Sequence, residues 1–180
     1  MRSILRFLLI LLAIVFLSAF HIGLAFLLPF PWSKINIILT VLIVLMFWWD
    51  SGFIIWLSFF SHLIIELYTT APFGILLTSG TLSILLSFWL YKYLFTNRSW
   101  YAAGALGLLT IFIYRAIYIM AILSLKFFGL TQILPWQNIM QTLSWELLFS
   151  VPAIALLFFI VSRFSRRLNT SLDHSALFKV

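Results

Sequence analysis

Long apolar runs separated by short polar breaks dominate the pattern of this chain. The apolar runs lie at 7–28, 35–49, 52–67, 74–95, 101–125 and 142–162. A helix needs about 20 apolar residues to cross the hydrocarbon core of a bilayer, which is ~30 Å thick. The second and third runs are shorter, and Asp50-Ser51-Gly52 between them is typical of a turn. We therefore predict an all-α polytopic membrane protein with a bundle of about six transmembrane helices. Five spans are the alternative, if the second and third runs form one long helix.

The first apolar run could be mistaken for a signal peptide, because Arg2 and Arg6 give it a basic start. Its apolar stretch is longer than the 7–15 residues usual for the core of a signal peptide, at roughly twice that length. No convincing cleavage site of small residues follows it. We therefore expect a retained first transmembrane helix.

Composition supports lipid as the main solvent of this chain. Of its 180 residues, 64% are hydrophobic and only 8% are charged. A soluble domain of this size could not hide so much apolar surface inside. Cysteine is absent, which excludes a disulfide framework, a thiolate nucleophile and a cysteine-ligated metal. The length indicates one transmembrane domain over residues 1–168 and a short cytoplasmic tail over 169–180.

The basic residues are distributed unevenly between the two ends of the predicted helices. With the N-terminus inside, only Lys34 and Lys126 fall on outer ends. The residues that then fall at or near cytoplasmic ends are Arg2, Arg6, Lys92, Arg98, Arg163, Arg166 and Arg167. This bias predicts that both termini face the cytoplasm. The net charge of +7 is explained in the same way, and we expect no nucleic-acid binding.

Small residues recur at helical spacing in two of the runs. Ser79, Ser83 and Ser87 repeat every four residues, and Ala103 and Gly107 form a second pair with the same spacing. Such residues let helix backbones approach closely in a membrane. We expect these stripes to mark helix contacts, with a substrate path as the alternative.

The longest link between runs extends from Lys126 to Gln141 and mixes aromatic, aliphatic and polar residues. That mixture is typical of a segment that lies in the membrane interface. A loop that binds a partner is the alternative.

Three charged residues fall inside the predicted spans: Glu66, Arg115 and Glu146. With a helical rise of ~1.5 Å per residue, Glu66 lies ~21 Å and Arg115 ~22 Å from the inner ends of their helices. Glu146 lies about one turn below the outer boundary. Charges in hydrocarbon usually face the bundle interior and pair with each other. We therefore expect Arg115 to pair with Glu66, with Glu146 as the second carboxylate.

Further polar side chains accompany these charges. His62 lies one turn before Glu66 on the same helix face, and Tyr114 and Tyr118 flank Arg115. We interpret Glu66, Arg115, Glu146, His62 and Tyr118 as an intramembrane polar cluster.

Three interpretations of this cluster stay open. It can fix the register of the helices, or it can line an outward-open cavity for a ligand or a partner segment. The two carboxylates can also act as acid and base in catalysis. The sequence contains no phosphate loop, zinc motif or nucleophile elbow, so we predict no enzyme activity, no cofactor and no metal site.

The segment from Glu66 to Gly74, read as Glu66-Leu67-Tyr68-Thr69-Thr70-Ala71-Pro72-Phe73-Gly74, resembles a pattern in rod shape-determining proteins of the MreD type. These small six-span proteins tend to carry an acid at the end of the third span, then a small polar pair and a Pro or Gly turn. The acid is more often Asp in that family, and a Ser-Gly pair stands where this chain has Thr69-Thr70. Gly52 also fits, and the resemblance covers roughly residues 35–120.

The resemblance implies a scaffold protein of bacterial lateral cell-wall synthesis and cell shape, in the inner membrane. Its partners would be MreC-like and cell-wall synthase membrane proteins, together with the lipid bilayer. The alternative is a substrate-binding membrane subunit of an energy-coupling-factor-type small-molecule transporter, whose six-helix fold this architecture also resembles.

Overall fold

The computed structural model describes residues 2–49, 51–95, 99–129 and 136–177. Its elements are α1 (Arg2–Leu27), the short 3-10 helix η1 (Trp32–Lys34), α2 (Ile37–Trp48), α3 (Phe53–Glu66), α4 (Ile75–Tyr93), α5 (Trp100–Phe127) and α6 (Trp136–Leu177). No strand occurs in these ranges, so the predicted all-α class is confirmed.

Four of the helices are long and apolar enough to cross a membrane. The qualifying stretches are Ile10–Leu27, Ile75–Tyr93, Trp100–Phe127 and Trp136–Phe164. Large apolar side chains on these helices are exposed, among them Leu12, Phe16, Met120 and Leu156. Contiguous exposed apolar surface of this kind is unfavourable in water but expected where the surrounding solvent is lipid. The chain is therefore a polytopic membrane protein.

The helices α2 and α3 are shorter than the spans predicted at 35–49 and 52–67. With 12 and 14 residues, they extend only about 18 and 21 Å, less than the hydrocarbon thickness. The two helices remain separate elements, as the turn chemistry at Ser51-Gly52 predicted. Neither is long enough to be a complete span by itself.

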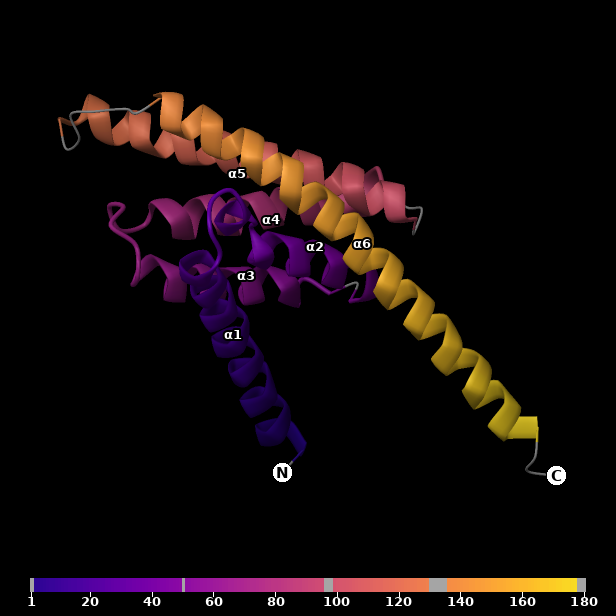
Figure 1. Ribbon diagram of the computed structural model, residues 1–180. Helices are drawn as coiled ribbons and strands as arrows, with labels where there is room; N and C mark the ends of the chain where they lie inside the picture. Colours follow the sequence, from indigo (N-terminus) through magenta and orange to yellow (C-terminus); the bar gives the residue numbers. More distant parts are fainter. Residues whose placement is uncertain (1, 50, 96–98, 130–135, 178–180) are drawn as a thin grey trace.

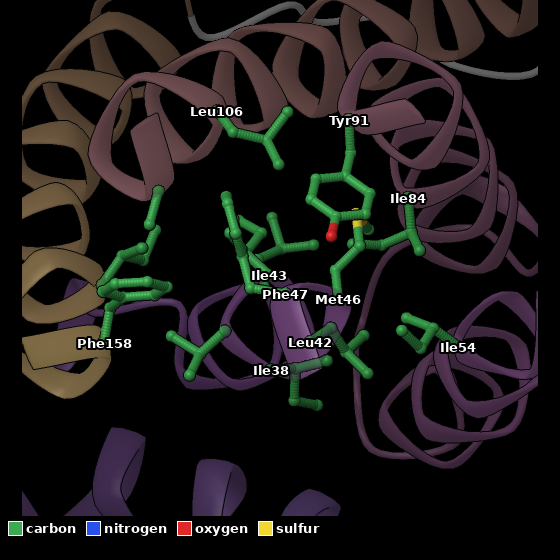
Figure 2. Close-up of a cluster of buried hydrophobic side chains, with 14 of the residues drawn as sticks. Ile38, Leu42, Ile43, Met46, Phe47, Ile54, Ile84, Tyr91, Leu106 and Phe158 are labelled. Carbon is green, nitrogen blue, oxygen red and sulfur yellow. The ribbon is translucent and has the colours of Figure 1, made fainter. Parts of the chain in front are cut away.

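The centre of the molecule is α2, which packs against all five other α-helices. Its buried residues are Ile38, Leu39, Thr40, Leu42, Ile43, Val44, Met46 and Phe47. Figure 2 shows its side chains directed toward residues of α3, α4, α5 and α6. The ring of Phe47 lies 4.9 Å from that of Tyr91 and 5.2 Å from that of Phe158, between centroids. A helix that is apolar on all sides is therefore explained here by burial in protein, not by contact with lipid.

Around this centre, α3, α4 and α5 run in alternating directions and α6 lies beside α5 (Figure 1). The first half of α1 and the last part of α6 extend away from the other helices. Successive antiparallel helices bring the end of α3, the start of α4 and the early part of α6 to one end of the bundle. This topology explains how Glu66 and Glu146, far apart in sequence, come to the same region.

The predicted small-residue stripes lie at helix contacts. Ser79, Ser83 and Ser87 are fully buried on α4, and each hydroxyl donates to a carbonyl of its own helix. The Ser87 hydroxyl also lies 2.7 Å from the Thr110 hydroxyl of α5. Gly107 is so close to α6 that an added Cβ would lie 2.4 Å from the Cδ1 atom of Ile154. The packing interpretation of these residues is therefore confirmed.

The predicted link over 126–141 is shorter in the structure. The helix α5 continues to Phe127 and α6 begins at Trp136, so residues 136–141 are part of a helix. The stretch 130–135 lies outside the described residues. At the other end, α6 continues to Leu177, past residue 168 where the tail was expected to begin.

Candidate functional site

Glu146 on α6 is the centre of the polar cluster, and it joins three helices. The Nε atom of Arg115 on α5 donates to its Oε2 atom at 2.6 Å. The Nδ2 atom of Asn36, at the start of α2, donates to its Oε1 atom at 2.8 Å. The Glu146 side chain is only 2% exposed and that of Arg115 is 15% exposed. Both carboxylate oxygens are thus satisfied inside the protein, which offsets part of the cost of burying the charge.

Asn36 is held in place by the helix that it caps. Its Oδ1 atom accepts a hydrogen bond from the backbone N–H of Leu39 at 3.1 Å, the usual arrangement of an N-cap. Its own backbone N–H donates to the Ser150 hydroxyl at 2.9 Å. Ser150 lies one turn after Glu146 on α6, so the two residues present acceptors on one helix face. Asn36 therefore connects the start of α2 to α6 by two hydrogen bonds, one from its backbone and one from its side chain.

Arg115 lies against two aromatic rings of its own helix. Its Cζ atom is 5.5 Å from the ring centroid of Tyr114 and 5.7 Å from that of Tyr118. The two rings are stacked, with centroids 6.5 Å apart. Cation–π attraction is strengthened where water is excluded, so the rings help to stabilise the guanidinium in this apolar setting.

The predicted pair between Glu66 and Arg115 is wrong, because Arg115 pairs with Glu146 and Glu66 has another role. The carboxylate of Glu66 accepts hydrogen bonds from the backbone N–H groups of Gly74 (3.0 Å), Leu76 (3.3 Å) and Leu77 (2.5 Å). These groups belong to the start of α4, where backbone donors have no partner within the helix. Glu66 is buried, and its negative charge complements the positive end of the α4 dipole.

The turn between α3 and α4 has the shape that this cap requires. Gly74 adopts a φ of 98°, a left-handed conformation that residues with a Cβ atom rarely adopt. It stands directly before the first residue of α4 and turns the chain back toward α3. The acid at the end of one helix and the glycine at the start of the next therefore form one structural unit.

His62 is buried one turn before Glu66, at the contact between α3 and α4. Its Nδ1 atom lies 2.8 Å from the Ser58 carbonyl oxygen, which accepts a hydrogen bond from it. The Ser58 hydroxyl donates to the Gly80 carbonyl of α4 at 3.2 Å. The ring centroid of His62 is 6.3 Å from that of Tyr114. Tyr114, which also lies beside Arg115, is therefore placed between His62 and the Arg115–Glu146 pair.

The structure thus divides the predicted cluster into two parts. Arg115, Glu146 and Tyr118 are in direct contact, whereas Glu66 and His62 serve the contact between α3 and α4. Tyr114 lies between the two parts, beside both His62 and Arg115. Sequence reasoning did not include Asn36 or Ser150. An Asn directly before an apolar run is a recognisable helix-start signal, but nothing in the run indicates which distant acid its amide faces.

Within the described part of the chain, no group of three or more His, Cys, Asp or Glu side chains could hold a metal ion. The two buried acids each have hydrogen-bond donors of the protein around them.

Comparisons with protein-family models, with curated proteins and with solved structures find no match to this chain.

Replacing Glu66 with Gln tests its role as the cap of α4. The amide retains one acceptor oxygen and directs its own N–H2 group toward backbone donors, so at least one buried N–H group loses its partner. We expect the free energy of unfolding in detergent micelles to fall by about 1–3 kcal/mol. The control is Ser51→Ala, which removes an exposed acceptor 3.3 Å from the Phe53 N–H and should change stability by less than ~0.5 kcal/mol. Equal effects of the two substitutions would contradict the cap role.

Proposed function

We propose that this protein is a membrane scaffold of the bacterial cell-elongation machinery, in the inner membrane. It would act by helix–helix recognition with MreC-like and cell-wall synthase membrane proteins. The observation that supports this role is the use of both buried acids to hold helices together. Glu146 joins α2, α5 and α6, and Glu66 joins α3 to α4. Acids that served a transported ligand or a reaction would be expected to face open space instead.

The geometry of the Glu66–Gly74 segment also supports the proposal. This segment carries the resemblance to MreD-type proteins. Its acid and its glycine both serve the start of α4. The acid caps the next helix, and the glycine provides the left-handed turn that brings the helix start within reach. An Asp at the acidic position could serve the same purpose with a slightly different turn, because it provides the same acceptor oxygens.

A surface suited to a partner helix lies between α1 and α3. A groove of about 300 Å³ is lined by residues of both helices. Its lining is apolar and includes Ile10, Ile14, Phe53, Trp56, Leu57 and Phe60. Trp56 and Phe60 are exposed, and α1 leaves most of its surface uncovered. Concave apolar surfaces with aromatic side chains are typical places for a packed partner.

Co-purification tests the proposal directly. The protein is co-expressed with the MreC-like and cell-wall synthase membrane proteins of the same genome, and complexes are captured in mild detergent. We expect capture by the native chain and a loss of about tenfold for Trp56→Ala combined with Phe60→Ala, because aromatic anchors carry much of an interface energy. The matched control is Trp89→Ala on α4, where the Trp is exposed to a similar degree, and this variant should retain capture.

Two results would contradict the scaffold proposal. One is the absence of capture for the native chain when every partner is present in the membrane. The other is a small molecule that remains bound through purification, detected by native mass spectrometry, which would favour the transporter-subunit alternative. An equal loss of capture for Trp89→Ala would show that the α1–α3 groove is not the specific surface.

A further inference from the structure

The Arg115 side chain has hydrogen-bonding capacity that the ion pair does not use. Its Nε atom donates to the Oε2 atom of Glu146, while the Oε1 atom accepts from Asn36. Among the residues that the structure describes, the two terminal nitrogens of Arg115 have no hydrogen-bond partner. The same is true of the hydroxyl groups of Tyr114 and Tyr118.

The three residues are near neighbours on α5, and Tyr114 is the most buried of them, with 6% exposure. The guanidinium carbon lies 5.5 and 5.7 Å from the two tyrosine ring centroids, so Arg115 lies beside both rings. Over the described ranges, the enclosed side-chain polar atoms without a partner belong to His21, Ser61 and Thr81, not to this group. The Arg115 side chain retains 15% exposure.

Unused donors of this kind are costly next to hydrocarbon. Lipid chains offer no acceptors, and an unsatisfied polar group there costs several kcal/mol. A ligand with several acceptor oxygens close together would satisfy the two terminal nitrogens and both hydroxyls at once. A phosphate group fits best, because it presents several oxygens and pairs with the two-pronged end of arginine in a bidentate manner.

The position of the group along the bundle also suits a phosphate. Arg115 is tied through Glu146 to Asn36, which directly precedes α2 and follows η1. Lys34 ends η1 and brings a second positive charge within two residues of Asn36. Because Glu146 offsets the charge of Arg115, the additional charge of Lys34 favours an anion near this end of α2.

We propose that Arg115, Tyr114 and Tyr118 form a binding site for a phosphate group, presented by an anionic phospholipid headgroup or by free phosphate. The terminal guanidinium nitrogens and the two hydroxyls donate to its oxygens, while Glu146 and Asn36 hold the arginine in position. This site goes beyond the scaffolding role and does not depend on it.

Binding of defined lipids to the purified protein tests this site. Native mass spectrometry after titration with phosphatidylglycerol or phosphatidylcholine compares headgroups with and without a net charge. We expect the native chain to prefer phosphatidylglycerol. Replacing both Tyr114 and Tyr118 with Phe keeps the rings and should lower that affinity by about tenfold, because it removes two donors to a charged acceptor. Arg115→Lys keeps the charge but loses the two-pronged end, and should lower it similarly.

The control and the other outcomes separate the sources of the phosphate. Tyr93→Phe changes an exposed tyrosine at the other end of α4 and should leave lipid binding unchanged. Competition by inorganic phosphate would identify free phosphate as a ligand, and its failure to compete would identify the lipid headgroup. Equal binding of the two lipids without any phosphate competition would overturn the proposal. Unchanged phosphatidylglycerol binding by both the Tyr variant and Arg115→Lys would also overturn it.

Discussion

Replacing Arg115 with Ala is expected to lower the free energy of unfolding by about 3–5 kcal/mol, because it leaves a buried carboxylate without its cationic partner. Glu146 is only 2% exposed, and Asn36 alone would then satisfy it. Thermal or denaturant unfolding in detergent micelles measures the loss. The matched control is Arg163→Ala, which removes an exposed arginine of α6 and should change stability by less than ~0.5 kcal/mol.

A double-mutant cycle distinguishes the observed ion pair from the one expected from sequence. Arg115→Met combined with Glu146→Met removes both charges, so we expect the double variant to recover part of the loss. The coupling energy between these positions should reach about 0.5–3 kcal/mol, whereas coupling between Arg115→Met and Glu66→Gln should stay within ~0.5 kcal/mol. A larger coupling to Glu66 than to Glu146 would show that the pairing described here is not the one in solution.

Replacing Gly80 with Ala should be the most damaging single-methyl change among the glycines of this chain. The new Cβ would lie 2.2 Å from two ring atoms of His62, well inside van der Waals contact. His62 has little room to move, since its Nδ1 bonds the Ser58 carbonyl and its ring faces Tyr114. We expect a loss of about 3 kcal/mol in unfolding free energy, at the upper end of the usual range for overpacking.

Two other glycines serve as controls in the same unfolding measurement. Gly23→Ala in α1 meets no atom within 4 Å and should be neutral or stabilising by up to ~1 kcal/mol. Gly107→Ala meets the end of the Ile154 side chain, which can rotate away, so we expect a loss of only about 1 kcal/mol. Combining Gly80→Ala with His62→Ala should recover part of the Gly80→Ala loss. If Gly80→Ala has no larger effect than Gly23→Ala, the close contact of α3 and α4 at His62 is not correct.

The roles of the two buried acids could be predicted only in part from the sequence. Counting residues along each run predicted a common level for Glu66, Arg115 and Glu146, and the structure brings Arg115 and Glu146 into contact. The choice between the two acids depends on how α3, α4, α5 and α6 are arranged around each other. The start of α4 lies a few residues after Glu66, and its backbone N–H groups have no carbonyl partner within the helix. These groups therefore compete with Arg115 for the carboxylate of Glu66, and in the structure they bind it. Such donors, together with the positive end of the helix dipole, favour an acid that lies close to a helix start.

The second apolar run shows why its burial could not be inferred from its composition. Residues 37–48 are as apolar as a lipid-facing span, yet they form the buried centre of the bundle. Hydrophobicity alone does not distinguish a helix surrounded by lipid from one surrounded by other helices, because both surroundings are apolar. The shortness of the apolar run at 35–49, below the ~20 residues of a full span, was the available signal.

The helical class, the membrane environment, the approximate bounds of α2 to α5 and the small-residue contacts of α4 and α5 could all be predicted from the amino-acid sequence. These properties depend on hydrophobicity, turn residues and side-chain size along continuous stretches of chain. The pairing of Arg115 with Glu146, the role of Asn36 in that pair and the capping of α4 by Glu66 became clear from the folded arrangement of the helices. Hydrogen bonds and ion pairs require distances of a few ångströms between atoms, and such distances between different helices are set by how the whole bundle packs.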